Sequence, residues 1–160
     1  MPQRTSLYSR RTVLGIAAAG MALGLVMPVA AQSPVTLDVY KDPNCGCCGG
    51  WVTHLRRNGF LARVADTAEM AAIKARLGVP DALVSCHTAQ LGSYIFEGHV
   101  PAHAIKRLLT EKPDALGLAV PGMPIGSPGM EGGTPETYDV ILFGKTGQSS
   151  FGRYVGDRPV

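Results

Sequence analysis

The chain has 160 residues, of which 15 are basic and 12 are acidic, and 46% are hydrophobic. A chain of this length can bury a core and fold as one domain without help from disulfides. The excess of three positive charges comes from three arginines within the first eleven residues, so the remainder is electrically balanced. This balance argues against nucleic acid and anionic membranes as partners.

Residues 1–31 have the pattern of a cleaved export signal. After the arginines, an uncharged stretch covers residues 13–27, and small residues at 29–31 supply a cleavage site. Residues 9–14 resemble the twin-arginine export motif without its usual Phe, and general secretory export is the alternative. Fifteen uncharged residues are few for a bilayer span, so we expect no membrane association after cleavage. The sequence therefore predicts a bacterial periplasmic protein with one mature domain at 32–160.

Apolar periodicity in the mature part predicts the element order βαβαββα. In chain order, we expect a strand at 35–40, a cysteine loop, a helix ending near Gly59, a strand at 60–64, a helix between Asp66 and Gly78, strands at 82–88 and 94–96, and a helix from Pro101 to Lys112. This order is that of the thioredoxin-like α/β fold. Open sheets of this class bind their ligands at the carboxyl ends of strands, where the cysteine loop follows the first strand.

Two shorter signals predict local details of this plan. Asp66 followed by Glu69 has the spacing of a capping box at the start of the second helix. Val79–Pro80 precedes the third strand, where thioredoxin-like proteins have a cis-proline facing the cysteine loop. We therefore predict a cis bond there, which is a minority conformer for proline, and expect Cys86 to lie near the loop.

The last third of the chain combines a Gly/Pro-rich segment with a predicted hairpin. Residues 113–137 contain six glycines and five prolines, so little regular structure is expected there, and a terminal β-hairpin is expected within 138–154. Met123 and Met130 lie in matching Pro-Gly-Met triplets of this segment. Thioether sulfur selects Cu(I), so both are candidate ligands, and the alternative is that both cap an apolar surface. We expect the segment to fold over the cysteine loop.

Three of the four cysteines, Cys45, Cys47 and Cys48, lie within four consecutive residues, and Cys86 stands alone. The start of a helix favours thiolate over thiol, and thiolates are soft ligands for Cu(I), Zn(II) or iron–sulfur clusters. Cys45 and Cys48 have the spacing of a redox dithiol, but the third cysteine between them is useful to a metal cluster and not to a catalytic disulfide. A structural cross-link from Cys86 to the loop is the remaining alternative.

The histidines give weaker signals. His87 is expected on the sheet face opposite to Cys86, because neighbouring side chains of a strand alternate. His99 either approaches the site or caps a turn. We expect His54 and His103 to be solvated on the surfaces of helices.

Three segments together resemble the CopG-type family of periplasmic copper-resistance proteins: Cys45–Cys48, Ser85–Thr88 and Gly117–Glu131. The likeness extends from Val35 to Tyr154. It implies a thioredoxin-like domain with a cysteine-bridged cluster of several copper ions and a role in Cu(I)/Cu(II) interconversion. The residues that it implies as ligands, or that match the family's motif, are Cys45, Cys47, Cys48, Cys86, Met123 and Met130.

The residues and the resemblance predict a copper-binding protein that acts in copper tolerance. Storage, delivery and redox conversion of copper all stay open, as does an enzymatic role as a copper oxidoreductase. Other periplasmic copper-handling proteins are the expected partners. The alternative from another class is a thiol–disulfide oxidoreductase that uses Cys45 and Cys48. A zinc or iron–sulfur protein is disfavoured by export and by the methionines.

Overall fold

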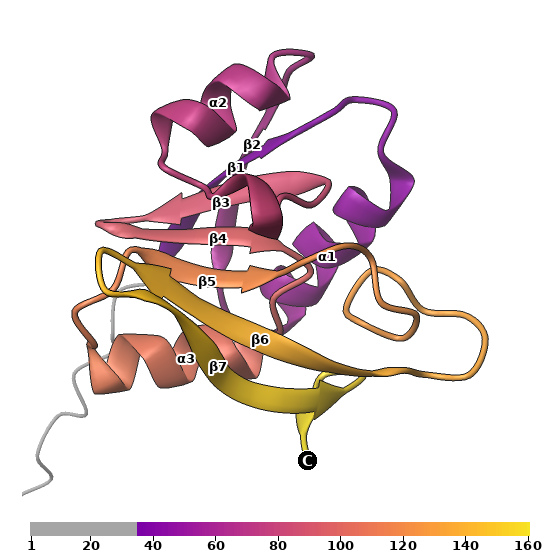
Figure 1. The fold of residues 1–160 in the computed structure, drawn as a ribbon. Helices are drawn as coiled ribbons and strands as arrows, with labels where there is room; N and C mark the ends of the chain where they lie inside the picture. The colour runs from indigo at the N-terminus through magenta and orange to yellow at the C-terminus, as the bar shows by residue number, and fades with distance from the viewer. Residues whose placement is uncertain (1–34) are drawn as a thin grey trace, which may run out of the picture. The chain divides into compact units, whose positions relative to one another are not determined.

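The structure is a computed structural model that describes residues 35–160, and the predicted leader at 1–31 lies outside the described residues. The helices all lie in the first part of the described chain, and only strands follow α3 (Figure 1). In chain order they are β1 (Thr36–Lys41), α1 (Gly46–Arg57), β2 (Leu61–Asp66), α2 (Met70–Arg76), the 3-10 helix η1 (Asp81–Leu83), β3 (His87–Leu91), β4 (Tyr94–Gly98), α3 (Ala102–Glu111), β5 (Gly117–Val120), β6 (Thr137–Gly144), β7 (Gly147–Val155) and β8 (Arg158–Pro159).

All eight strands belong to one sheet with the order β2-β1-β3-β4-β5-β6-β7-β8. Strand β1 is parallel to β2 and antiparallel to β3, and β3 forms a hairpin with β4. The first four strands and three helices follow the predicted βαβαββα order, which confirms the thioredoxin-like α/β fold. Strands β5 to β8 extend the sheet beyond β4, and they include the predicted terminal hairpin as β6 and β7.

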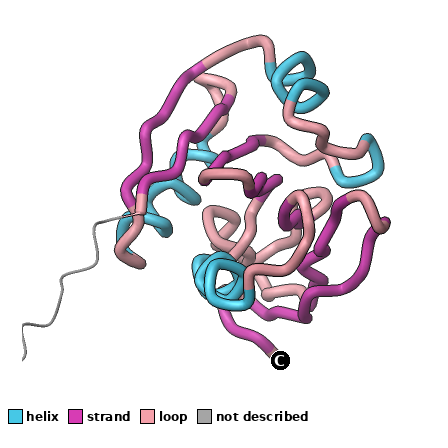
Figure 2. Tube along the Cα trace, turned by 90° about the vertical axis from the view of Figure 1, so that its left-hand side faces the viewer, coloured by secondary structure: helices cyan, strands magenta, loops and turns pink. Residues whose placement is uncertain are grey.

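The sheet buries apolar side chains on both faces because its strands lie between two sets of helices. The views of Figures 1 and 2 agree in placing α2 away from α1 and α3. Neighbouring residues of a strand therefore enter different clusters, as Ile95 and Phe96 do. On the α1 and α3 side the buried residues include Leu37, Val39, Trp51, Leu55, Phe96, Ile105, Leu108, Leu118 and Val120, and on the other side they are Val79, Leu83, Ile95, Ala119 and Phe143.

Strand β5 lies inside the segment for which little regular structure was predicted. All four of its residues are buried, and it pairs with β4 and β6. A Cβ atom at Gly117 would lie 1.8 Å from the Ile95 carbonyl oxygen, so a residue without a side chain is required at this position. Gly117, which contributed to the loop prediction, therefore allows β5 to pair closely with β4.

Three local predictions are wrong. The third strand begins at His87, whereas residues 81–83 form η1. The Val79–Pro80 bond is trans, like every other peptide bond in residues 35–160. Helix α2 begins at Met70 with Glu69 as its N-cap and has no side-chain cap, whereas Asp66 is the last residue of β2, where its carboxylate pairs with Lys41 Nζ at 2.8 Å.

No helix within residues 35–160 is long and apolar enough to cross a membrane.

Candidate metal centre

The sheet brings the cysteine loop and Cys86 to the same edge. Cys45 is the N-cap of α1, and Cys47 and Cys48 lie in its first turn. Strands β1 and β3 are antiparallel with Lys41 opposite His87, so the chain leaves β1 where it enters β3. Cys86 therefore lies beside the loop, as predicted, although the predicted cis bond is absent.

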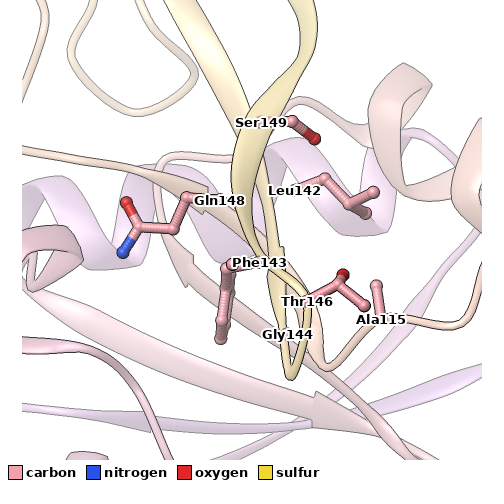
Figure 3. Close-up of a pocket in the computed structure, with 8 residues that line it drawn as sticks. Ala115, Leu142, Phe143, Gly144, Thr146, Gln148 and Ser149 are labelled. Carbon is pink, nitrogen blue, oxygen red and sulfur yellow. The ribbon is translucent and has the colours of Figure 1, made fainter.

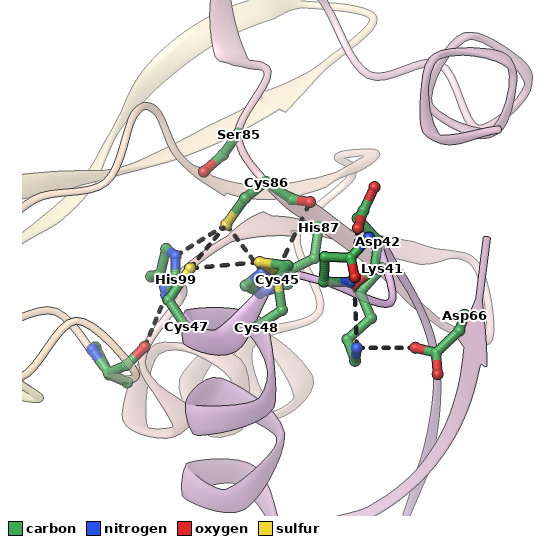
Figure 4. The surroundings of a disulfide bond; sticks show 12 residues. Lys41, Asp42, Cys45, Cys47, Cys48, Asp66, Ser85, Cys86, His87 and His99 are labelled. Carbon is green, nitrogen blue, oxygen red and sulfur yellow. Dashed lines mark hydrogen bonds and ion pairs between the residues drawn. A yellow bond between two sulfur atoms is a disulfide. The ribbon is translucent and has the colours of Figure 1, made fainter. Parts of the chain in front are cut away.

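The four cysteine sulfurs lie within 4.8 Å of one another (Figure 4). Cys45 and Cys48 form a disulfide, and Cys47 and Cys86 are free thiols. Cys47 Sγ lies 3.4 Å from Cys45 Sγ and 3.9 Å from Cys86 Sγ. Cys86 is thus in contact with the loop without being cross-linked to it.

The surroundings of the sulfurs determine which protonation states are favoured. The side chain of Cys48 is fully buried, and the other three cysteines are partly exposed. Burial, and then the neighbouring Cys47, raise the pKa of the Cys86 thiol to about 12. Without a bound cation, Cys86 is therefore a neutral thiol at neutral pH. A metal that binds there has to displace the proton.

Two histidines complete the site on the Cys86 side. His99 Nε2 lies 3.0 Å from Cys86 Sγ, and His99 Nδ1 lies 2.8 Å from the Pro128 carbonyl oxygen. The carbonyl can only accept a hydrogen bond, so Nδ1 carries the proton and Nε2 offers its lone pair toward Cys86. Burial lowers the pKa of His99, which keeps the imidazole neutral and leaves the Nε2 lone pair available to a metal ion.

His87 does not lie on the opposite face from Cys86, and that prediction is wrong. Cys86 precedes β3, so its side chain and that of His87 need not point to opposite faces of the sheet. His87 Nδ1 lies 3.3 Å from Cys86 Sγ. The side chain is fully buried, and Nε2 has no hydrogen-bond partner among residues 35–160. Burial, and then His99, hold the pKa of His87 well below its usual value. Cys86, His87 and His99 form a second group that could hold a metal ion.

The single tryptophan of the chain lies next to His87. The Trp51 ring is buried 4.4 Å from the His87 ring, and its Nε1 donates to the Val100 carbonyl oxygen. Its fluorescence is therefore placed to report on the site.

The other two histidines differ from each other. His54 is half-buried rather than solvated, because its Nε2 accepts a hydrogen bond from the Ala102 N–H at the start of α3. Burial lowers its pKa. His103 is exposed, as predicted, and its Nδ1 lies 3.1 Å from the Tyr154 hydroxyl.

The Gly/Pro-rich segment packs against the first turn of α1, as expected. A Cβ atom at Gly129 would lie 2.5 Å from the Cys47 carbonyl oxygen and 2.6 Å from the Trp51 nitrogen, and Gly129 has a φ of +89°. Only glycine permits this approach. The same stretch supplies the Pro128 carbonyl that orients His99.

The methionines occupy different environments within this segment. Met123 is 53% exposed, whereas Met130 is half-buried, and its backbone closes a turn with Gly126 and Ser127. Their role as ligands stays a prediction.

A buried polar network lies behind Cys86. The fully buried Glu97 carboxylate accepts hydrogen bonds from Lys74 Nζ at 2.5 Å, from the Ser85 N–H at 2.6 Å and from Thr88 Oγ1 at 2.6 Å. The network thus binds α2, β3 and β4 to the backbone just before Cys86. Sequence reasoning missed it, because nothing in the sequence pairs a lysine and a glutamate 23 residues apart.

A shallow depression at the β6–β7 turn is lined by none of the cysteines or histidines (Figure 3). Its lining offers no thiol, imidazole or carboxylate group, and consists of Ala115, Leu142, Phe143, Gly144, Thr146, Gly147, Gln148 and Ser149.

Comparisons with known proteins agree with this geometry. Residues 83–130 match a family described as a protein of unknown function, DUF411. No protein of curated function matches the chain. Two solved structures, titled copper resistance protein CopG form 1 and form 2, are each 46% identical to this chain and cover 76% of it. The match spans 98% of form 1 with a TM-score of 0.72, and 99% of form 2 with a TM-score of 0.73. The chain therefore belongs to the CopG family.

Proposed function

We propose that the protein acts in copper resistance by binding Cu(I) in a multinuclear site built from its four cysteines. The observation that carries this proposal is the gathering of four sulfurs within 4.8 Å from two separate segments. Soft thiolate donors select Cu(I), and sulfurs this close can bridge several ions. The relatives titled copper resistance protein support copper as the metal.

The proposed ligands fall into an inner and an outer group. Cys45, Cys47, Cys48 and Cys86 supply thiolates, and His99 adds a neutral nitrogen whose tautomer is already set by Pro128. Met123 and Met130 are proposed as outer ligands, because their segment packs against the first turn of α1.

The disulfide between Cys45 and Cys48 gives the site two states. With the bond formed, two thiols remain, and with the bond reduced, four thiolates can bind. This difference supports Cu(I)/Cu(II) interconversion as part of the function. The location that we propose is the bacterial periplasm, from the leader pattern, with other periplasmic copper-handling proteins as partners.

The second candidate is a thiol–disulfide oxidoreductase. A specific observation favours it, because the Cys45–Cys48 disulfide lies at the start of α1 in a thioredoxin-like fold. Cys47 discriminates between the two functions, since a metal cluster uses this residue and a two-cysteine redox cycle does not.

Anaerobic titration of the reduced protein with Cu(I), against a chromophoric Cu(I) chelator, tests the proposed function. We expect more than one Cu(I) per chain, a near-ultraviolet copper–thiolate band and quenching of Trp51 fluorescence. Cys47→Ser should lower the stoichiometry, and His103→Ala, which changes an exposed histidine outside the cluster, should not. A stoichiometry of one or less that Cys47→Ser leaves unchanged would contradict the cluster.

A further inference from the structure

The four cysteines divide into two pairs with different positions. Cys45 and Cys48 are joined by a disulfide within the first turn of one helix. Cys47 and Cys86 come from separate segments, remain free, and hold their sulfurs 3.9 Å apart. We propose that the first pair supplies the electrons that reduce Cu(II) and that the second pair holds the Cu(I) produced. This division of labour rests on the proposed function.

The electron balance of the step is complete within the site. The two thiols of Cys45 and Cys48 release two protons and give one electron each to two Cu(II) ions. A sulfur–sulfur bond forms between them, and two Cu(I) ions result, because a dithiol–disulfide couple carries two electrons. The disulfide seen in the structure is the product state of this step.

The donors that remain after oxidation suit the reduced metal. Cys47 and Cys86 keep their sulfurs, and His99 Nε2 lies 3.0 Å from Cys86 Sγ with its lone pair toward the site. Two sulfurs and one imidazole nitrogen form a soft donor set that favours Cu(I) over Cu(II). Oxidation of the other pair would instead consume Cys86 Sγ, the sulfur that lies 3.0 Å from His99 Nε2 and 3.3 Å from His87 Nδ1 (Figure 4).

Accessibility also distinguishes the two sulfurs of the electron-supplying pair. Cys48 is fully buried, whereas Cys45, the N-cap of α1, is partly exposed. A dithiol reductant that restores the site therefore attacks Cys45 Sγ and displaces Cys48 as the leaving thiolate. Its second thiol then resolves the mixed disulfide and leaves both cysteines reduced.

The test begins with fully reduced, metal-free protein mixed anaerobically with two equivalents of copper(II) sulfate. Cu(I) is measured with a Cu(I)-specific chelator, remaining thiols are counted after the metal is removed, and the disulfide is located by non-reducing peptide mass mapping. We expect two Cu(I) ions formed and two thiols lost per chain, as a two-electron couple requires, with the new bond between Cys45 and Cys48.

Three variants sharpen the test. Cys45→Ser keeps a good N-cap residue for α1, so the fold is retained, and this variant should lose the stoichiometric reduction. Cys47→Ser should still form the Cys45–Cys48 bond, but its Cu(I) should separate from the protein on gel filtration. His103→Ala should match the unchanged protein in both respects.

Several outcomes would overturn the inference. They are a new bond between Cys47 and Cys86, four thiols that survive Cu(II), and a Cys45→Ser variant that reduces Cu(II) as fast as the unchanged protein. A parallel Cu(I) titration separates this failure from failure of the proposed function. If Cu(I) binds at more than one ion per chain and Cu(II) is not reduced, only the inference fails. If Cu(I) is not retained, the proposed function fails as well.

Discussion

Cys86 joins the two kinds of donor in the site, because its sulfur contacts both the cysteine loop and the histidines. Cys47 Sγ lies 3.9 Å from this sulfur, and His99 Nε2 lies 3.0 Å from it. A copper ion that binds at this sulfur would have to compete with a proton, because the pKa of Cys86 is raised. An uncharged nitrogen beside it supplies a donor that needs no deprotonation, which makes His99 the residue to test.

We expect His99→Ala to lower the affinity for Cu(I) by roughly tenfold or more, the usual cost of losing a group that ligates a metal or orients a ligand. Competition with a chromophoric Cu(I) chelator at pH 7 measures the change. His103→Ala is the matched control, since His103 is exposed and contacts Tyr154 instead of the cluster. Equal affinities in the two variants would exclude His99 from the site.

Two contacts between elements determine where the site's parts lie. The first is the approach of the Gly/Pro-rich segment to α1 at Gly129. The second is the Glu97 network, through which α2, β3 and β4 hold the backbone of Ser85. Both contacts can be disrupted without changing a proposed ligand.

Gly129→Ala should destabilise the protein by about 1–3 kcal/mol, because a residue with a side chain at positive φ is strained and the added Cβ meets the backbone of α1. Urea denaturation measures the change in the free energy of unfolding. Gly122→Ala is the control, since Gly122 also has positive φ but a Cβ there meets no atom within 4 Å. We expect the larger loss, together with faster reaction of Cys47 with thiol reagents, in Gly129→Ala. Similar losses in both variants would show that the contact with α1 contributes nothing.

Glu97→Gln should lower the free energy of unfolding by about 3–5 kcal/mol, because it leaves the buried Lys74 ammonium without its counter-charge. Adding Lys74→Met should recover most of the loss, since no buried charge then remains unpaired. The control is Glu111→Gln, which breaks an exposed pair with Arg107 and should cost less than about 1 kcal/mol. Equal unfolding free energies for Glu97→Gln and Glu111→Gln would contradict a structural role for the network.

Across the whole molecule, the sequence predicts features that depend on local periodicity. The βαβαββα order and the terminal hairpin follow from apolar spacing, and the closeness of Cys86 to the loop follows from the fold. Strand β5 was missed because glycine and proline dominate the composition around a buried run of four residues. The start of β3 was misplaced because Glu97, from another strand, holds the Ser85 N–H.

The positions of the histidines depend on tertiary contacts, and the sequence could not supply them. His99 is oriented by a carbonyl 29 residues away. His87 contacts Cys86 because Cys86 lies just before the first residue of β3. The pairing of Cys45 with Cys48 was one alternative that spacing allowed, and no local pattern distinguished it from a state with four free thiols.

The four proposed thiolate ligands come from two places in the chain, and Cys48 and Cys86 are 38 residues apart. A copper ion held by both places would form a reversible cross-link between the segment after β1 and the segment before β3. A ligand that binds only the folded state stabilises it by about 2.7 kcal/mol at a concentration one hundred times its dissociation constant. Resistance to unfolding and to proteases would then rise with the copper supply. The lifetime of the protein would itself follow the abundance of the metal that it handles.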